Sequence, residues 1–130
     1  MKASRGHMGR LVVTAWVLWA FSAASALAAE LVVYRRDGCP FCVRFEREVA
    51  PVYAKTREGG RAPLRRVDLP AGGISGAGLA EPVIATPTFV LVDRGREIGR
   101  ITGYLNDDMF WGLLGQLLAG MDKPQDETKP

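Results

Sequence analysis

The chain has 130 residues, enough for one small domain with a modest hydrophobic core. It carries 17 basic and 14 acidic residues, and Lys2, Arg5 and Arg10 account for the excess of three basic residues. Beyond these positions the net charge is about zero, so it gives no indication of binding to nucleic acid or to a membrane surface. The single histidine, His7, lies in the same segment, which excludes Cys–His hydrolases and histidine-ligated zinc from the rest of the chain.

The first 28 residues have the pattern of a signal peptide. A basic start is followed by an uncharged, largely apolar run, which closes on Ala26-Leu27-Ala28, the small-x-small pattern that signal peptidase cleaves. We expect export to the periplasm with cleavage after Ala28; an uncleaved N-terminal membrane anchor is the alternative, because a run of this length can cross a bilayer. The chain is thus divided into a signal peptide at 1–28, a domain at 29–120 and a tail at 121–130 that we expect to be disordered.

The domain begins with a predicted strand and helix. Residues 31–34 are continuously apolar and β-branched, which predicts a short buried strand, and Asp37-Gly38 predicts the turn out of it. A helix is expected from Pro40, since proline suits the first helical turn and apolar residues then recur at helical spacing. We expect Phe45 on the core side of this helix.

A second strand follows at residues 64–69. Pro51 is expected to kink the preceding helix or to end its first segment, and Gly59-Gly60 is expected to end the helical region. Pro70 then stops the strand. The connection between the two strands is long enough for a right-handed parallel crossover.

Residues 71–86 are rich in glycine but match neither pattern of a phosphate-binding loop. We expect an adaptable loop with at most a short helical turn around residues 77–81. Strands are predicted at 88–92 and 97–101, and the short connection between them indicates an antiparallel hairpin. A closing helix is expected from an N-cap at Asn106 to Gly120.

The only two cysteines form the motif Cys39-Pro40-Phe41-Cys42 at the junction of the first strand and the first helix. Unpaired N–H groups and the positive end of the helix dipole favour a thiolate at Cys39, and Cys42 can attack a mixed disulfide formed there. A purely structural bridge is a poor interpretation, because so small a loop removes little unfolded-state entropy. Val43 follows the motif, which excludes haem attachment through C-x-x-C-H. We predict a redox-active disulfide, with Phe41 exposed beside it.

The predicted order βαβ-ββα, with C-x-x-C opening the first helix, resembles the thioredoxin-like superfamily. Thr86-Pro87-Thr88-Phe89 lies where thioredoxins and glutaredoxins carry a cis-proline beside their cysteines. The resemblance implies an α/β thioredoxin-like fold, with a mixed four-stranded sheet flanked by helices. It also implies that Cys39 and Cys42 are catalytic and that Thr86, Pro87, Pro40 and Phe41 contact the substrate.

The chain departs from thioredoxins beneath the cysteines. Val33 stands where thioredoxins keep a buried aspartate as proton acceptor, and no lysine in the second predicted strand partners such an acid. Glu46, one helical turn beyond Cys42, is therefore the candidate proton acceptor. The alternative for Glu46 is a solvated surface acid.

A narrower resemblance is to the small periplasmic thioredoxins of bacterial sulfur-oxidation gene clusters. It is carried by residues 51–53, 61–68, 86–93, 95–101 and 103–104. It implies reduction of periplasmic cysteine-containing proteins, notably the sulfur-carrier protein of that pathway, with electrons from a membrane thiol transporter. No cofactor beyond the Cys39–Cys42 disulfide and no metal is expected.

Two alternatives remain open from the sequence. One is a general disulfide oxidase or isomerase, or a thioredoxin of cytochrome maturation, because the motif itself does not fix the direction of electron flow. The other is a soft-metal-binding chaperone that uses the two thiolates. Disulfide reduction by the purified domain, compared with Cu(I) titration, distinguishes an enzyme from a chaperone.

Overall fold

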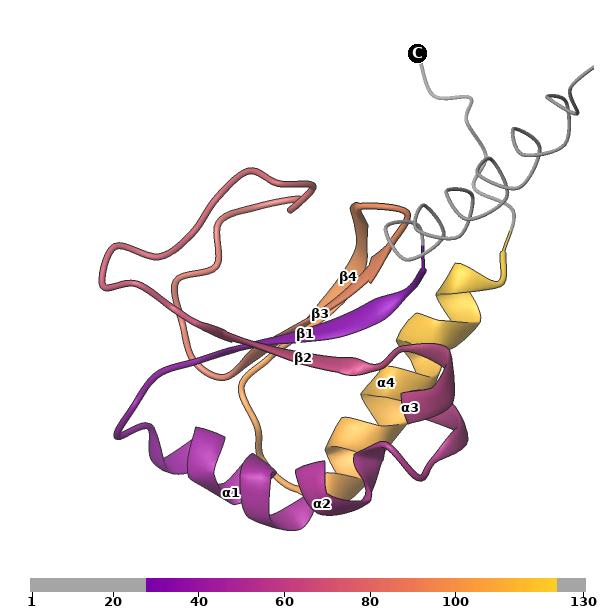
Figure 1. Cartoon of the computed structure of the whole chain (residues 1–130), viewed down its shortest axis with the longest axis horizontal. Helices are drawn as coiled ribbons and strands as arrows, with labels where there is room; N and C mark the ends of the chain where they lie inside the picture. Colours follow the sequence, from indigo (N-terminus) through magenta and orange to yellow (C-terminus); the bar gives the residue numbers. More distant parts are fainter. Residues whose placement is uncertain (1–27, 124–130) are drawn as a thin grey trace, which may run out of the picture.

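The computed structural model describes residues 28–123, and within them a four-stranded mixed sheet lies against a layer of helices (Figure 1). The strands are β1 (Glu30–Arg35), β2 (Leu64–Asp68), β3 (Thr88–Asp93) and β4 (Arg96–Thr102). The helices are α1 (Pro40–Glu48), α2 (Ala50–Tyr53), α3 (Arg57–Arg61) and α4 (Asp107–Met121). The strand order is β2-β1-β3-β4; β1 and β2 are parallel, and the other pairs are antiparallel. The predicted fold class, the parallel crossover and the hairpin are confirmed.

The main core lies between the sheet and the helices. Phe45 of α1 is buried against Phe89 of β3 and Phe110 of α4, with ring centroids 4.7 and 5.3 Å apart. Leu31 of β1 and Leu114 of α4 belong to the same buried cluster. Phe45 therefore lies in the core as predicted, and it fixes α1 to both the sheet and the closing helix.

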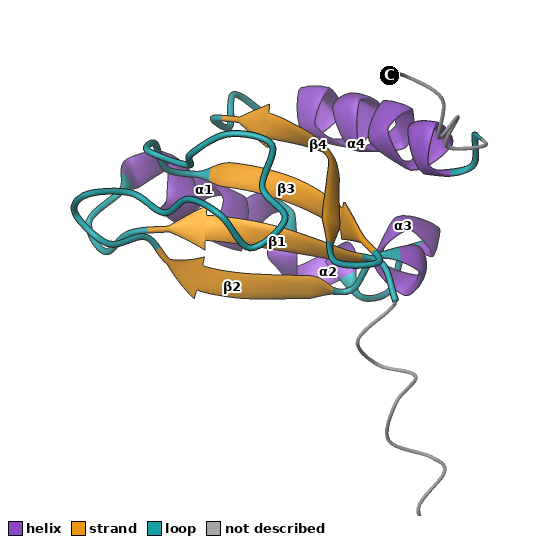
Figure 2. Cartoon of the chain, turned by 90° about the horizontal axis from the view of Figure 1, so that it is seen from above, coloured by secondary structure: helices purple, strands orange, loops and turns teal. Residues whose placement is uncertain are grey.

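The opposite face of the sheet is covered by a loop. Val32, Tyr34 and Val90 point to this side, where Leu69 and Val83 from the connection between β2 and β3 are buried against them. Figure 2, seen from above, shows this connection crossing over the strands. The glycine-rich segment is thus a packed cover held to the sheet by apolar contacts. It includes two turns: Gly73 N–H donates to Pro70 C=O, and Leu79 N–H donates to Gly76 C=O.

The helical region between β1 and β2 is interrupted where proline predicts it but continues through the glycine pair. The first helix ends at Glu48, and α2 resumes with Pro51 in its first turn. Gly59-Gly60 was expected to end the region, which ends one residue later, at Arg61, so that both glycines lie inside α3. Thr56 caps α3 by accepting from Gly59 N–H, and a Cβ at Gly59 would clash with the backbone of Tyr53. Close packing against α2, rather than chain termination, explains this glycine.

The closing helix begins as predicted and ends one residue later. Asn106 Oδ1 accepts from Met109 N–H at 2.8 Å, which is an N-cap hydrogen bond. The helix continues through Gly120 to Met121, which packs against the main core, so residue 121 belongs to this helix and not to the tail that was expected to start there. Apolar contact at Met121 outweighs the helix-ending tendency of Gly120.

The expected signal peptide and most of the expected tail lie outside the described residues, which begin at Ala28 and end at Lys123. Within this range no helix has the length and apolar character needed to cross a membrane.

Replacing Phe110 with alanine is expected to lower the free energy of unfolding by about 3–5 kcal/mol, because a buried aromatic ring is lost and leaves a cavity. Chemical denaturation of the domain measures this change. Met109→Ala on the same helix is the matched control, since Met109 is exposed and its loss should cost no more than about 0.5 kcal/mol. Equal losses in the two variants would contradict the placement of Phe110 at the centre of the core.

Candidate active site

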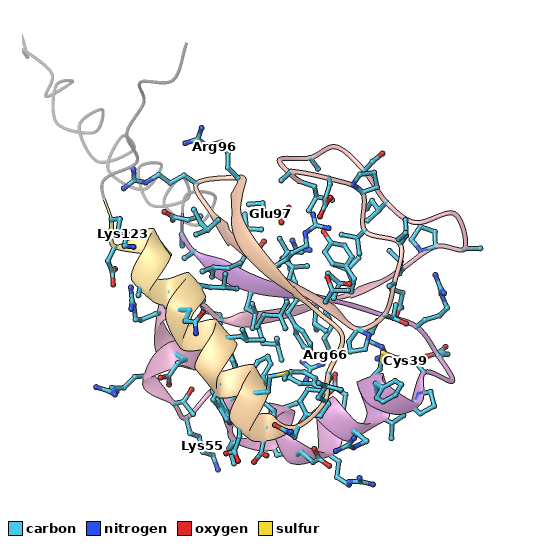
Figure 3. All side chains as sticks on the ribbon, turned by 180° about the vertical axis from the view of Figure 1, so that it is seen from behind. Cys39, Lys55, Arg66, Arg96, Glu97 and Lys123 are labelled. Atoms are coloured by element: carbon cyan, nitrogen blue, oxygen red, sulfur yellow. A yellow bond between two sulfur atoms is a disulfide. The ribbon has the colours of Figure 1, made fainter. Side chains whose placement is uncertain are left out.

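Cys39 and Cys42 form a disulfide at the start of α1, with their Cα atoms 5.2 Å apart (Figure 3). Cys39 is the N-cap residue, and its Sγ accepts from Cys42 N–H at 3.2 Å. Cys39 is partly exposed, whereas only 5% of Cys42 is accessible. A partner can therefore approach the Cys39 sulfur directly, and the helix N–H groups lie where a thiolate at this position would be stabilised.

The turn before α1 is held by backbone and arginine contacts. Gly38 has a φ of +77°, a conformation that favours glycine, and Cys39 N–H donates to Arg36 C=O at 3.3 Å. The Arg36 guanidinium in turn donates to the carbonyls of Leu69 and Pro70, at 3.4 and 3.2 Å. These bonds attach the cysteine turn to the end of β2.

The Thr86–Pro87 turn lies at the same end of the sheet as the cysteines. Its peptide bond is cis, and the register of β3 on β1 places Thr88 opposite Tyr34, close to the end of the strand that leads to Cys39. Gly103 N–H donates to Pro87 C=O at 2.7 Å, and the Thr88 hydroxyl donates to Ala85 C=O at 2.8 Å. In the part of the chain that the structure describes, the backbone groups of Thr86 make no hydrogen bond with other backbone groups.

Large apolar side chains are exposed in the segments that form this end of the molecule. Phe41 is 48% exposed, as predicted for the residue between the cysteines, and Pro40 is exposed beside it. Ile84 precedes the Thr86–Pro87 turn and Leu105 follows Gly103, and both are also exposed. The sequence reasoning did not single out Ile84 or Leu105. In the sequence, each could have been found as a large apolar residue in a loop segment that adjoins the predicted site.

Glu46 is held by an arginine that the sequence reasoning missed. Arg66 of β2 donates to both carboxylate oxygens of Glu46, at 2.7 and 2.8 Å, and links α1 to β2. Arg66 lies opposite Val33 in the β1–β2 pairing, and Val33 is itself buried in the main core. The site therefore contains an arginine–carboxylate ion pair close to Val33. The carboxylate comes from helix α1 and not from the strand position that Val33 occupies. The role of Glu46 as proton acceptor stays a prediction.

Tyr104 ties the loop after β4 to α1. It is buried, and its hydroxyl donates to Glu48 at 2.7 Å. Burial, together with this hydrogen bond to an anionic acceptor, raises the pKa of Tyr104, and the same bond lowers the pKa of Glu48. The contact keeps Gly103, which bonds Pro87, close to the cysteine helix.

These features define a class of protein: the thiol–disulfide oxidoreductases with the thioredoxin fold. Among residues 28–123 no three His, Cys, Asp or Glu side chains gather as metal ligands. The redox-active group of this class is a cysteine pair, which Cys39 and Cys42 provide here.

Comparisons with known proteins identify the family. The periplasmic thioredoxin SoxS from Paracoccus pantotrophus, solved in its reduced form, is 38% identical; the match has a TM-score of 0.66 and covers 72% of this chain and 99% of SoxS. A thioredoxin-fold protein from Helicobacter pylori is 22% identical with a TM-score of 0.51, covers 79% of this chain and 75% of its own, and shows the fold alone. No family model and no curated protein matches the chain. The chain belongs to the thioredoxin family and is of the SoxS type.

We predict that Cys39 is the attacking thiol. In single-cysteine variants, Cys39 should be alkylated faster than Cys42 at neutral pH, and its rate should rise at a pH below the free-thiol pKa of about 8.5, because it is exposed at a helix start. Alkylation rates measured against pH test this. A faster reaction at Cys42 would reverse the two roles.

We further predict that Glu46 accepts the proton of Cys42. Glu46→Gln should then slow resolution of the mixed disulfide by about 100-fold, the lower range for loss of a general base. Stopped-flow measurement of the resolution step tests this, with Glu58→Gln on α3 as the control for loss of one carboxylate. A rate unchanged by Glu46→Gln would leave Glu46 as a structural partner of Arg66 only.

Proposed function

We propose that the mature protein is a periplasmic reductase that acts on disulfides of a small set of cysteine-containing proteins. The identity of 38% over nearly the whole length of a periplasmic thioredoxin is the observation that carries this proposal. The signal-peptide pattern of residues 1–28 supports export, and the resemblance to thioredoxins of sulfur-oxidation clusters supports the choice of partner. The preferred partner is the sulfur-carrier protein of such a pathway.

The proposed reaction has two exchange steps. The Cys39 thiolate attacks one sulfur of the partner disulfide, forms a mixed disulfide and releases the other partner sulfur as a thiolate. Cys42, after losing its proton, attacks the Cys39 sulfur, forms the Cys39–Cys42 disulfide and releases the second partner thiolate. The partner gains two electrons and the enzyme loses two. The burial of Cys42 favours its use within the molecule over attack on a partner.

The proposed partner chain lies against the Thr86–Pro87 turn. The backbone of Thr86 has no backbone partner among the described residues, so it can pair with an extended segment of the partner. Pro40 and Phe41 lie between the cysteines and offer apolar contact to the same segment. This arrangement selects partners by the chain around their cysteines as well as by the disulfide itself.

The reductase needs a source of electrons, because a dithiol alone in an oxidising compartment becomes oxidised. We propose a membrane thiol transporter as the donor. The alternatives to a reductase are a general oxidase or isomerase, a thioredoxin of cytochrome maturation and a soft-metal chaperone. The family membership favours an enzyme over the chaperone.

Cys42→Ser is expected to stop the reaction at the mixed disulfide, since Cys39 still attacks but nothing resolves the product. Expressed in the native periplasm, this variant should be isolated covalently bound to few proteins, the sulfur carrier among them. Cys39→Ser, expressed to the same level, is the control and should trap none of them. Capture of many unrelated secreted proteins would indicate a general folding oxidase and would overturn the proposed specificity.

A further inference from the structure

The segment that leads into the Thr86–Pro87 turn is fixed to the sheet by a largely buried ion pair. We call residues 79–85 the strap, because they run along β4 on the face of the sheet without helices (Figure 2). Glu97 and Arg100, both on β4, have side chains that are only 5% and 14% exposed. Arg100 donates to the two carboxylate oxygens of Glu97 at 2.6 and 2.7 Å. This bidentate arginine–carboxylate contact is among the strong hydrogen-bonded ion pairs.

Both members of the pair also hold the backbone of the strap. Arg100 donates to the carbonyls of Glu81 and Pro82, at 2.8 and 3.2 Å, and Glu97 accepts from Ala80 N–H at 2.8 Å. The hydrogen bonds from Arg100 lower the pKa of Glu97, so the pair is ionised at neutral pH. A single arginine fork therefore binds one carboxylate and two successive carbonyls, which a lysine ammonium cannot reproduce.

At the end that leads to the Thr86–Pro87 turn, the strap is fixed by backbone pairing and by a hydrogen bond from Thr88. Val83 pairs with Ile74 through two backbone hydrogen bonds, and Ala85 C=O accepts from the Thr88 hydroxyl. Between these two points Ile84 is 74% exposed. The contacts of Arg100 with Glu81 and Pro82 thus fix the position of the chain just before residues 83–86, which lead to the Thr86–Pro87 turn.

A groove runs along this path. It has a volume of about 180 Å³ and is lined by strap residues together with Thr88, Arg100 and Thr102. On its other side the groove is bounded by Arg100 and Thr102 of β4, which is an edge strand of the sheet. Its shape depends on the strap, because strap residues form one of its walls.

We propose that Arg100 and Glu97 are positioning residues for partner binding, which hold the strap so that Ile84 and the backbone at Thr86 are presented to a cysteine-containing polypeptide. The proposal rests on the proposed reductase function. A protein substrate needs this surface, whereas a small aromatic disulfide reaches Cys39 without it. The pair should therefore affect the KM for a protein disulfide and leave the chemical step unchanged.

The test compares two substrates, insulin and 5,5′-dithiobis(2-nitrobenzoate). Insulin is reduced in turnover with dithiothreitol as the electron donor. The small disulfide is instead mixed with pre-reduced enzyme from which dithiothreitol has been removed, because free dithiothreitol reduces this reagent directly. The variant is Glu97→Gln with Arg100→Met, because loss of Arg100 alone would leave a buried unpaired carboxylate. We expect the KM for insulin to rise about tenfold, as for the loss of a hydrogen-bonded contact, with kcat and the rate on the small disulfide unchanged. The single variant Glu97→Gln keeps the Arg100 carbonyl contacts and should retain most of the affinity for insulin.

The matched control removes another bidentate Arg–Glu ion pair, which does not contact the strap. Arg65 donates to both oxygens of Glu30, so Glu30→Gln with Arg65→Met changes the charge and hydrogen bonding of the sheet in the same way. This control should leave both substrates unaffected. An unchanged KM for insulin in the Arg100 variant would overturn the proposal, as would equal losses on insulin and on the small disulfide.

A second variant keeps the test decisive if the double variant does not fold. Arg100→Lys retains the positive charge beside Glu97 but lacks the planar fork, and we expect a smaller rise in the KM for insulin with an unchanged rate on the small disulfide. An unchanged KM for insulin in this variant would also overturn the proposal. Failure of the wild-type domain to reduce either substrate is a different result, which would overturn the reductase function itself.

Discussion

The contact between Phe45 and Phe89 connects the two halves of the active site. Phe45 lies one helical turn after Cys42, and Phe89 lies two residues after Pro87, so this single aromatic pair brings the cysteine helix against the strand that follows the cis turn. Phe110 of the closing helix packs against both rings and completes the core at this point. Because apolar packing is dense and tolerates little displacement, the distance between the cysteines and the turn is set by these side chains.

Three polar contacts attach the loops of the site to this core. Arg36 attaches the cysteine turn to the end of β2, and the Tyr104–Glu48 hydrogen bond attaches the loop after β4 to α1. Arg100 attaches the strap to β4. Each contact joins a loop of the site to an element of the core, so loops that carry the chemistry are held by a rigid frame.

The order of elements was predictable from the sequence, because it rests on local signals. The apolar run before Cys39, Pro40 at the first helical turn and Asn106 as an N-cap each act within a few residues. The two cysteines were predictable for the same reason, since their spacing and their place at a helix start are both local.

Contacts between distant parts of the chain were not predictable. Gly59 was interpreted as a helix end, but its role depends on how closely α3 approaches Tyr53. Arg66 lies 20 residues from Glu46, and Arg100 lies 18 or more residues from the carbonyls that it binds. No periodicity in the sequence marks such pairs, because arginine on a strand is equally compatible with a solvated surface. The cover over the second face of the sheet was missed because glycine-rich composition indicates a loop but not its packing.

The redox state of Cys39–Cys42 inside the cell tests the central claim most directly. Cells are quenched with acid, free thiols are labelled with a maleimide that adds mass, and the fraction of protein with two labels is measured. A reductase supplied with electrons by the membrane should be largely in the dithiol form at steady state. A pair that is largely oxidised in growing cells would contradict the account and would indicate that the protein donates its disulfide instead.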